Sequence, residues 1–230
     1  MQSKKPTVGV MALQGAVREH IRSLEDCGAR GVLVKYPSEL SLCDGLVIPG
    51  GESTTIGRLM SDYGFVEEIR RLAEEGMPVY GTCAGLILMA KRIAGEERTL
   101  LGLMDVTVRR NAYGRQVDSF ETDLLVKDIE QEGRPFRAVF IRAPWIEEVG
   151  PGVRVLAVHR ERVVAARQGN LLATAFHPEL TPDRRIHGLF LRMVTGRGLS
   201  SGGKPLTGGL EEGSPAEGEE EKVKGLWKKK

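Results

Sequence analysis

The stretch Val79-Tyr-Gly-Thr-Cys83-Ala-Gly-Leu-Ile-Leu88 predicts the fold class of this chain. A short apolar run ends in Gly-x-Cys-x-Gly, and a helical pattern follows, which indicates a strand, a sharp turn and a helix. Small residues two positions before and after Cys83 let the backbone turn without a Cβ clash. The pattern is typical of a nucleophile elbow with sulfur in place of hydroxyl, and it predicts a sulfur exposed at the carboxyl end of a sheet.

The same turn favours a reactive thiol at Cys83. The residue would lie at a helix N-terminus, where the macrodipole favours thiolate over thiol, and the NH of Ala84 would point towards a developing oxyanion. The alternative is a small buried residue, as isolated cysteines usually are. Neither Cys27 nor Cys43 lies in a Gly-x-Cys-x-Gly frame, and both are expected to be structural. Three widely spaced cysteines without a CxxC pair indicate neither a disulfide framework nor a metal site.

Apolar runs and helical patterns alternate outward from this turn, through the first half of the chain. Strands are expected over 8–13, 31–35, 45–48 and 78–81, and helices over 16–26, 65–75 and 84–93. This rhythm predicts an α/β fold of three layers, a mostly parallel, flavodoxin-like sheet with helices on both faces. Short strands then predominate, over 106–110, 119–126, 138–141, 153–159, 162–168 and 171–176, before a last helix over 184–194. Some of these strands would extend the sheet, and others would form a small antiparallel extension.

Length and composition indicate one soluble globular domain, over residues 1–195. The chain has 230 residues, 41% hydrophobic and 28% charged, with a formal net charge of +2. Such a balance offers no field to attract nucleic acid or anionic lipid, so neither is expected as a partner. No stretch approaches the roughly 20 apolar residues of a membrane span, and no signal segment is evident, so we expect a cytoplasmic protein. Residues 196–230, rich in glycine and charge runs, are expected to form a disordered low-complexity tail, with partner binding through Trp227 as the alternative.

A thiolate that attacks an amide needs a general base, and the chain has four histidines. His20 and His187 have the spacing of helix surfaces, and His159 begins a charged turn. His177 ends an apolar run, where a strand end would place it beside other strand ends. Glu179, two residues on, could accept a hydrogen bond from its imidazole, which gives a base and an orienter. The alternative is a structural histidine at a strand end.

A third pattern is the loop within Leu46-Val-Ile-Pro-Gly-Gly-Glu-Ser-Thr-Thr55. An apolar run stops at proline, two glycines free the backbone, and Ser53 or Thr54 could cap a following helix. Such a loop can present a backbone NH to an anion, as the second half of an oxyanion hole. Phosphate binding and an ordinary tight turn are the alternatives, although the lysine of a phosphate-binding P-loop is absent.

With these three patterns in this order, the sequence resembles class I glutamine amidotransferases. More narrowly, it is similar to the PdxT-type glutaminase subunits of two-protein pyridoxal 5′-phosphate synthases. The general resemblance is carried by Pro49–Gly51, Gly81–Gly85 and Phe176–Glu179. The narrower one is carried by Leu13–His20, Gly50–Thr54, Arg110–Glu121 and Ile141–Pro144. It extends from Thr7 to about Val194.

The resemblance implies that Cys83 attacks the side-chain amide of L-glutamine and forms a thioester. His177 would act as base and then acid, with Glu179 as its orienter. The NH groups of Gly51 and Ala84 would form the oxyanion hole. The implied substrate contacts are Gly51, Glu52, Ser53, Arg110, Ile141 and Arg142. The two arginines suit a carboxylate, with surface salt bridging as their alternative role.

The resemblance also implies a partner. Ammonia would pass to a PdxS-type synthase subunit in a hetero-oligomeric complex, which builds pyridoxal 5′-phosphate from ribose 5-phosphate and glyceraldehyde 3-phosphate. Glutaminase activity would be low until that subunit docks, and the glutaminase itself would need no cofactor. Two rival interpretations keep the fold: a cysteine peptidase or amidase, and a non-catalytic interaction module. Partner-stimulated release of ammonia from glutamine separates them from the glutaminase.

Overall fold

The computed structural model describes residues 5–110 and 119–196. Its helices are α1 (Val17–Asp26), α2 (Ser53–Asp62), α3 (Phe65–Glu74), α4 (Ala84–Met89) and α5 (Arg185–Thr195), with 3-10 turns η1 (Pro37–Leu42) and η2 (Pro178–Leu180). Its strands are β1 (Thr7–Met11), β2 (Arg30–Val34), β3 (Gly45–Ile48), β4 (Val79–Thr82), β5 (Ala90–Ile93), β6 (Met104–Arg109), β7 (Ser119–Leu124), β8 (Phe136–Ile141), β9 (Trp145–Val149), β10 (Arg154–His159), β11 (Arg162–Gln168) and β12 (Leu171–Thr174). The tail predicted to be disordered lies, from residue 197 on, outside the described residues.

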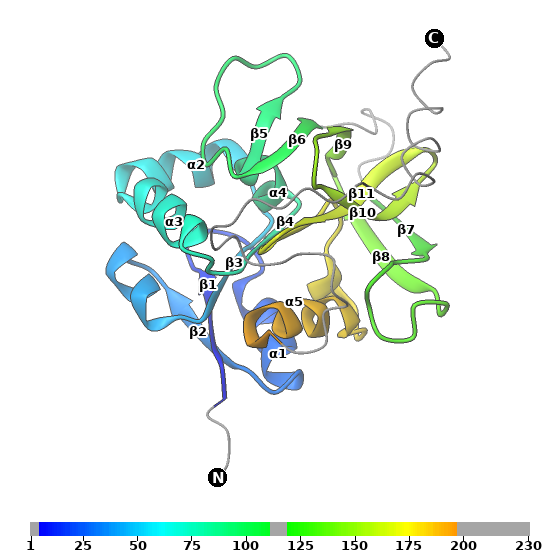
Figure 1. Cartoon of the computed structure of the whole chain (residues 1–230), viewed down its shortest axis with the longest axis horizontal. Helices are drawn as coiled ribbons and strands as arrows, with labels where there is room; N and C mark the ends of the chain where they lie inside the picture. Colours follow the sequence, from blue (N-terminus) through cyan, green and yellow to red (C-terminus); the bar gives the residue numbers. More distant parts are fainter. Residues whose placement is uncertain (1–4, 111–118, 197–230) are drawn as a thin grey trace, which may run out of the picture. The chain divides into compact units, whose positions relative to one another are not determined.

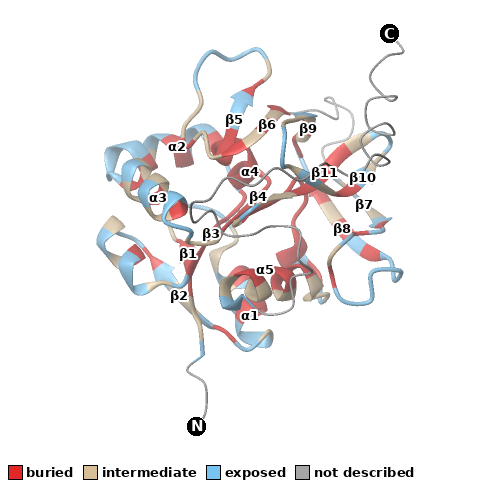
Figure 2. Cartoon of the chain, viewed as in Figure 1, coloured by how far each residue is buried: buried red, intermediate tan, exposed pale blue. Residues whose placement is uncertain are grey.

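Five parallel strands form the centre of the main sheet, in the order β2-β1-β3-β4-β12. Every residue of β3, β4 and β12 is buried, as expected for parallel strands covered on both faces. Figure 2 shows this buried centre between the outer helices. The carboxyl ends of β4 and β12 lie side by side, since Thr82 is paired with Thr174. The turn after β4 therefore lies next to the segment that follows β12.

Helices cover both faces of these strands, so the predicted three-layer α/β architecture is confirmed. Figure 1 shows α1 and α5 together on one side of the sheet, and α2, α3 and α4 on the other. The apolar periodicity of α3 explains its placement, because the helix buries the stripe Phe65, Ile69 and Ala73. Helix α1 also buries one face, but that face combines Leu24 with the polar His20 and Ser23. The face that carries α1 and α5 becomes important for the site.

The second half of the chain extends the sheet with antiparallel pairings. Strand β11 pairs with β12, β9 and β10, and β9 pairs in turn with β6. A separate two-stranded sheet joins β7 to β8, which is the small antiparallel extension that the sequence predicted. Strand β8 packs towards the end of β12, with the rings of Phe140 and Phe176 5.5 Å apart. This contact brings the end of β8 to the site.

Two elements differ from the sequence prediction. The helix expected over 84–93 ends at Met89, where Ala90 becomes extended, and residues 90–93 form β5. Strand β9 was not predicted at all. Both strands owe their conformation to pairing with β6, a partner that local periodicity cannot reveal, and short apolar runs suit either helix or strand.

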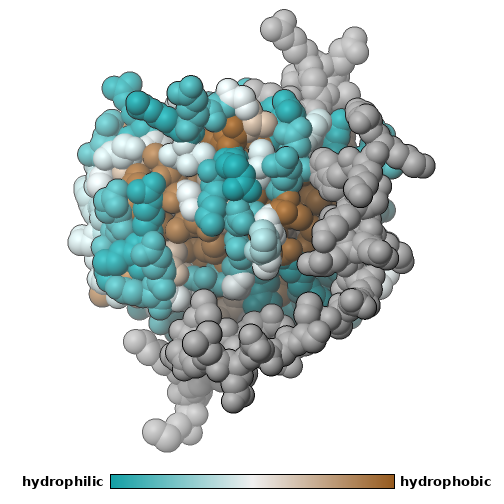
Figure 3. Space-filling model, turned by 45° about the horizontal axis from the view of Figure 1, so that its top comes forward, coloured by the Kyte–Doolittle hydropathy of each residue, from teal (hydrophilic) through white to brown (hydrophobic). Residues whose placement is uncertain are grey.

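The exposed apolar side chains are spread over several elements. The larger ones are Leu33, Tyr36, Leu42, Tyr63, Leu125, Ile141, Val158 and Leu180. Figure 3 shows one face, on which hydrophilic side chains lie between the apolar areas. Scattered exposed apolar residues are normal on soluble proteins and indicate no site by themselves. Within residues 5–110 and 119–196, no helix has the length and apolarity to cross a membrane.

Candidate active site

Cys83 forms the turn between β4 and α4. Its φ of 48° and ψ of −99° lie in a region that residues with a side chain rarely adopt. A Cβ on Gly81 would lie 2.5 Å from the carbonyl carbon of Gly85, and a Cβ on Gly85 would collide with the carbonyl oxygen of Ile48. Both glycines of Gly-x-Cys-x-Gly are thus required by close packing.

The thiol is less accessible than the sequence predicted. Cys83 is buried, with 6% of its surface exposed. Its Sγ lies 3.8 Å from the carbonyl oxygen of Ile141, at the end of β8, and Gly50 packs against its Cβ side. The prediction of an exposed sulfur was wrong, because strand β8 and the loop after β3 cover the elbow. The short helix α4, with six residues, also offers a weaker dipole than the predicted one.

His177 and Glu179 form a buried pair beside this thiol. Nδ1 of His177 lies 2.8 Å from Oε1 of Glu179, and the two residues are 8% and 4% exposed. The backbone NH of His177 donates to the carbonyl of Val139 on β8, at 2.8 Å. Pro178 begins the turn η2 that returns Glu179 towards the ring. Because Nδ1 faces the carboxylate, Nε2 remains for the thiol.

The electrostatics of the pair favour an imidazolium. Burial acts to lower the pKa of His177, but its hydrogen bonds to Cys83 and Glu179 outweigh burial and raise the pKa to about 10. Burial acts to raise the pKa of Glu179, and the neighbouring His20 and His177 hold it below its usual range. A carboxylate that stays ionised beside an imidazole is the arrangement that orients a catalytic base.

The loop after β3 meets Cys83 and His177 through Gly50. A Cβ at this position would collide with Cε1 of His177 and would lie 3.3 Å from the Cβ of Cys83. The helix that follows is α2, and Glu52 is its N-cap, accepting from the NH groups of Thr54 and Thr55 at 3.1 and 2.7 Å. The Thr55 hydroxyl and these NH groups lower the pKa of Glu52 to about 2. The predicted capping by Ser53 or Thr54 was wrong, since a longer carboxylate reaches the same NH groups.

Gln14 supports this loop and was missed as a site residue. Its Oε1 accepts from the NH of Glu52, at 3.0 Å. A Cβ on the adjacent Gly15 would collide with the carbonyl oxygen of Gly50, so the segment after β1 packs directly on the loop after β3. Gln14 lies within a motif that carried the family resemblance, but the contact joins two distant loops and has no local signal.

The remaining predicted contacts surround these elements. Arg110 donates to Glu96 and to the hydroxyl of Thr54, each at 2.9 Å, and lies 3.8 Å from Glu52. Arg110 is therefore next to the Gly51–Ser53 segment, although its guanidinium already forms ion pairs with Glu52 and Glu96. Arg142, exposed and with a φ of 42°, directly follows Ile141. The part of the motif over 111–118 lies outside the described residues.

His20 and His187, expected on helix surfaces, are both completely buried. Nε2 of His20 lies 3.4 Å from Oε2 of Glu179, and Nδ1 of His20 lies 3.0 Å from Nε2 of His187. The helical spacing was correct, but α1 and α5 pack against each other and turn these residues inward.

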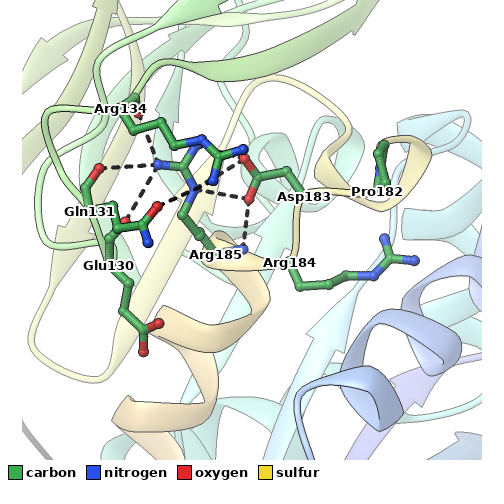
Figure 4. A pocket seen from close by; sticks show the side chains of 7 residues that line it. All are labelled: Glu130, Gln131, Arg134, Pro182, Asp183, Arg184 and Arg185. Carbon is green, nitrogen blue, oxygen red and sulfur yellow. Dashed lines mark hydrogen bonds and ion pairs between the residues drawn. The ribbon is translucent and has the colours of Figure 1, made fainter.

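A pocket of about 480 Å³ lies apart from the predicted site residues and is structural in character. Arg185 donates there to the carbonyls of Gln131, Arg134 and Pro135 at 3.2, 2.9 and 2.8 Å, and to Asp183 at 2.6 Å (Figure 4). Its guanidinium is thus saturated and joins the start of α5 to the turns before β8. No group of three or more His, Cys, Asp or Glu side chains in the described part of the chain is arranged to hold a metal ion.

Comparison with known proteins identifies the family of this chain. The sequence pattern of the SNO glutamine amidotransferase family matches residues 10–196. The pyridoxal 5′-phosphate synthase subunit PdxT of Niallia circulans is 61% identical over 187 residues, covering 81% of this chain and 97% of its own. The subunit of the same name from Moorella thermoacetica is 56% identical, covering 81% and 98%. A solved structure described as a glutamine amidotransferase is 47% identical, with a TM-score of 0.77 and coverage of 82% and 98%. This chain belongs to the SNO glutamine amidotransferase family.

Proposed function

We propose that this chain hydrolyses L-glutamine to L-glutamate and ammonia through a thioester on Cys83. The observation that carries the proposal is the 2.8 Å contact between Nδ1 of His177 and Oε1 of Glu179, on a ring whose pKa is raised by the neighbouring Cys83 and Glu179 against the effect of burial. Family membership supports the same chemistry.

The groups present suffice for both half-reactions. The thiolate of Cys83 attacks the amide carbon, the C–N bond breaks, and His177 gives its proton to the departing nitrogen as ammonia leaves. Water then attacks the thioester while His177 takes its proton. The C–S bond breaks, glutamate leaves, and the thiolate and imidazolium are restored. Glu179 remains ionised throughout and holds the ring.

The oxyanion and the substrate would be bound around this triad. We assign the oxyanion hole to the NH groups of Gly51 and Ala84, on the loop after β3 and at the first residue of α4. We assign glutamine contacts to Gly51, Glu52, Ser53, Arg110, Ile141 and Arg142. In support, Gly50 packs against both Cys83 and His177, so the assigned loop borders the reacting atoms.

The product ammonia would pass to a partner. The relatives are named subunits of pyridoxal 5′-phosphate synthase, and we infer that this chain delivers ammonia to a PdxS-type synthase subunit in a hetero-oligomeric complex in the cytoplasm. Residues 1–195 would form the catalytic domain.

Ammonia release from glutamine, measured with and without the cognate synthase subunit and with Cys83→Ala as control, tests the proposal. Strong release that needs the partner and is lost in the variant is the expected result. Release that is indifferent to the partner would keep the glutaminase but contradict the pathway. Absence of release in both conditions would favour a peptidase or a non-catalytic module.

A further inference from the structure

A buried chain of polar side chains continues from the triad into the protein. Oε1 of Glu179 faces His177, while the buried Oε2 has no hydrogen-bond partner among the described residues and lies 3.4 Å from Nε2 of His20 as an ion-pair contact. The hydroxyl of Thr82 on β4 lies 3.3 Å from the same Nε2. On its other side, Nδ1 of His20 lies 3.0 Å from Nε2 of His187. Helices α1 and α5 thus each place one histidine behind the catalytic carboxylate.

Both histidines are neutral near pH 7. Burial lowers the pKa of His20, and the charge of His177 acts in the same direction. The charges of Glu179 and Glu19 act to raise this pKa but do not outweigh burial. Burial lowers the pKa of His187 further, with His20 and Arg184 acting in the same direction. The ring of Tyr80, on β4, makes edge-to-face contacts with both imidazole rings. Burial raises the pKa of its hydroxyl, which therefore stays uncharged.

Each neutral ring carries one proton, and the surroundings decide which of its two nitrogens holds it. If His20 carries its proton on Nε2, that N–H faces the anionic oxygen of Glu179, and Nδ1 accepts from the Nε2–H of His187. The opposite tautomer would aim a lone pair at the carboxylate. It would also give His187 an Nδ1–H, although no partner for that atom exists among the described residues. A buried donor without a partner costs more than an unused acceptor.

We infer that His20 is a positioning residue for glutamine hydrolysis, which holds Oε2 of Glu179 while His187 fixes the tautomer of His20. This inference rests on the proposed roles of Cys83, His177 and Glu179. Among the described residues no arginine or lysine forms an ion pair with Glu179. The imidazoles of His177 and His20 are therefore the groups that stabilise its charge. The approach of His20 to Oε2 favours the carboxylate orientation in which Oε1 faces His177. Loss of the contact would loosen the ring and raise the pKa of Glu179.

Two nearly isosteric variants separate positioning from mere packing. In His20→Gln the amide nitrogen can occupy the place of Nε2 and still donate to Glu179. In His20→Asn the polar atoms lie near the place of Nδ1, and Oε2 of Glu179 loses its neighbour. Ser23→Ala, at another fully buried position of α1, serves as the control for damage to the helix.

Each variant is assayed with the synthase subunit present, over a range of pH. We expect His20→Asn to lower kcat about ten- to hundredfold, with little change in KM, and to move the acid limb of the pH profile upward. His20→Gln should recover most of this loss, and Ser23→Ala should match the parent. Equal losses in the Gln and Asn variants, or an unmoved acid limb, would overturn the inference. The proposed function would still stand in that case, because it is tested separately by ammonia release from the parent protein and by the loss of turnover in Cys83→Ala.

A measurement on the unsubstituted protein covers the case in which neither variant folds. Nitrogen NMR of histidine-labelled protein reports the tautomer of each ring. His20 with its proton on Nε2 is the expected result, and His20 with its proton on Nδ1 would contradict the inference.

Discussion

His177 and Glu179 are separated by one proline, yet Nδ1 and Oε1 of their side chains lie 2.8 Å apart. The 3-10 turn that begins at Pro178 folds the carboxylate back under the ring. The proposed base and its orienter therefore belong to one short segment, which the NH of His177 anchors to β8. Cys83, the third residue of the proposed triad, follows the neighbouring strand β4. Its position beside the other two residues therefore depends on the pairing of β4 with β12.

Glu179→Gln should lower kcat about a hundredfold, less than His177→Ala or Cys83→Ala. The amide can still accept from Nδ1–H, but it lacks the charge that stabilises the imidazolium. Relative kcat values of the three variants, measured with the partner present, check this order. A loss in Glu179→Gln as large as in the other two would contradict the secondary role of the carboxylate.

Cys83→Ala should abolish turnover and leave the affinity for glutamine within a fewfold of the parent. The thiolate performs the chemistry, while the other contacts supply most of the binding free energy. Calorimetric titration with glutamine, in the presence of the synthase subunit, measures the affinity. Loss of binding together with turnover would show that the substitution disturbs the strained elbow as well as the nucleophile.

Gly50→Ala should inactivate the enzyme through His177. The new methyl group would collide with Cε1 of that ring, so the base must move or the loop must shift, at a cost of about 1–3 kcal/mol. Gly188→Ala is the control, since a Cβ there meets no atom within 4 Å and alanine favours a helix. Assays and urea unfolding of both variants test this, and an active Gly50→Ala enzyme would refute the contact.

The free energy of unfolding should fall as the pH drops below about 6.5. The folded protein holds His20 and His187 neutral, with pKa values below 6.5, whereas the unfolded chain protonates them at their usual pKa. Their contribution is therefore complete above pH 6.5 and is lost on acidification, by up to about 1.4 kcal/mol per pH unit for each histidine. Urea unfolding at several pH values should give a shallower decline for His187→Phe. An unchanged slope would mean that the ring is already protonated in the fold.

Arg185→Lys should destabilise the fold by about 2–3 kcal/mol, because an ammonium cannot satisfy the carbonyls of Gln131, Arg134 and Pro135 together with Asp183. Chemical unfolding measures the change. Arg58→Lys, at an exposed helical ion pair, should be nearly neutral. Similar small effects of the two substitutions would show that the pocket of Figure 4 does not hold the turns before β8 in place.

Elements whose conformation depends on residues close to one another in the sequence were predictable. Strand β3 begins and ends where its apolar run predicted, and Gly81 and Gly85 are required around Cys83 as the motif indicated. The pairing of His177 with Glu179 was accessible too, because it depends on a spacing of two residues and a proline.

What could not be predicted depends on partners far away in the sequence. Strand β9 exists because β6 and β11 lie on either side of it. His20 shows the same limit within the site: helical spacing places it on one face of α1, but only the packing of α5 makes that face an interior. Glu52 was missed as an N-cap because shorter polar side chains are the usual choice.

The pairing of Thr82 with Thr174 also has a consequence for biosynthesis. Strand β12, between β4 and β11, is the last strand of the sheet to leave the ribosome, and it carries His177 and Glu179 just behind it. Until then β4 has an unpaired edge, and the nascent polypeptide holds a cysteine with no base beside it. Synthesis in the N-to-C direction therefore delays assembly of the proposed reactive centre until β12 and the segment after it have been translated.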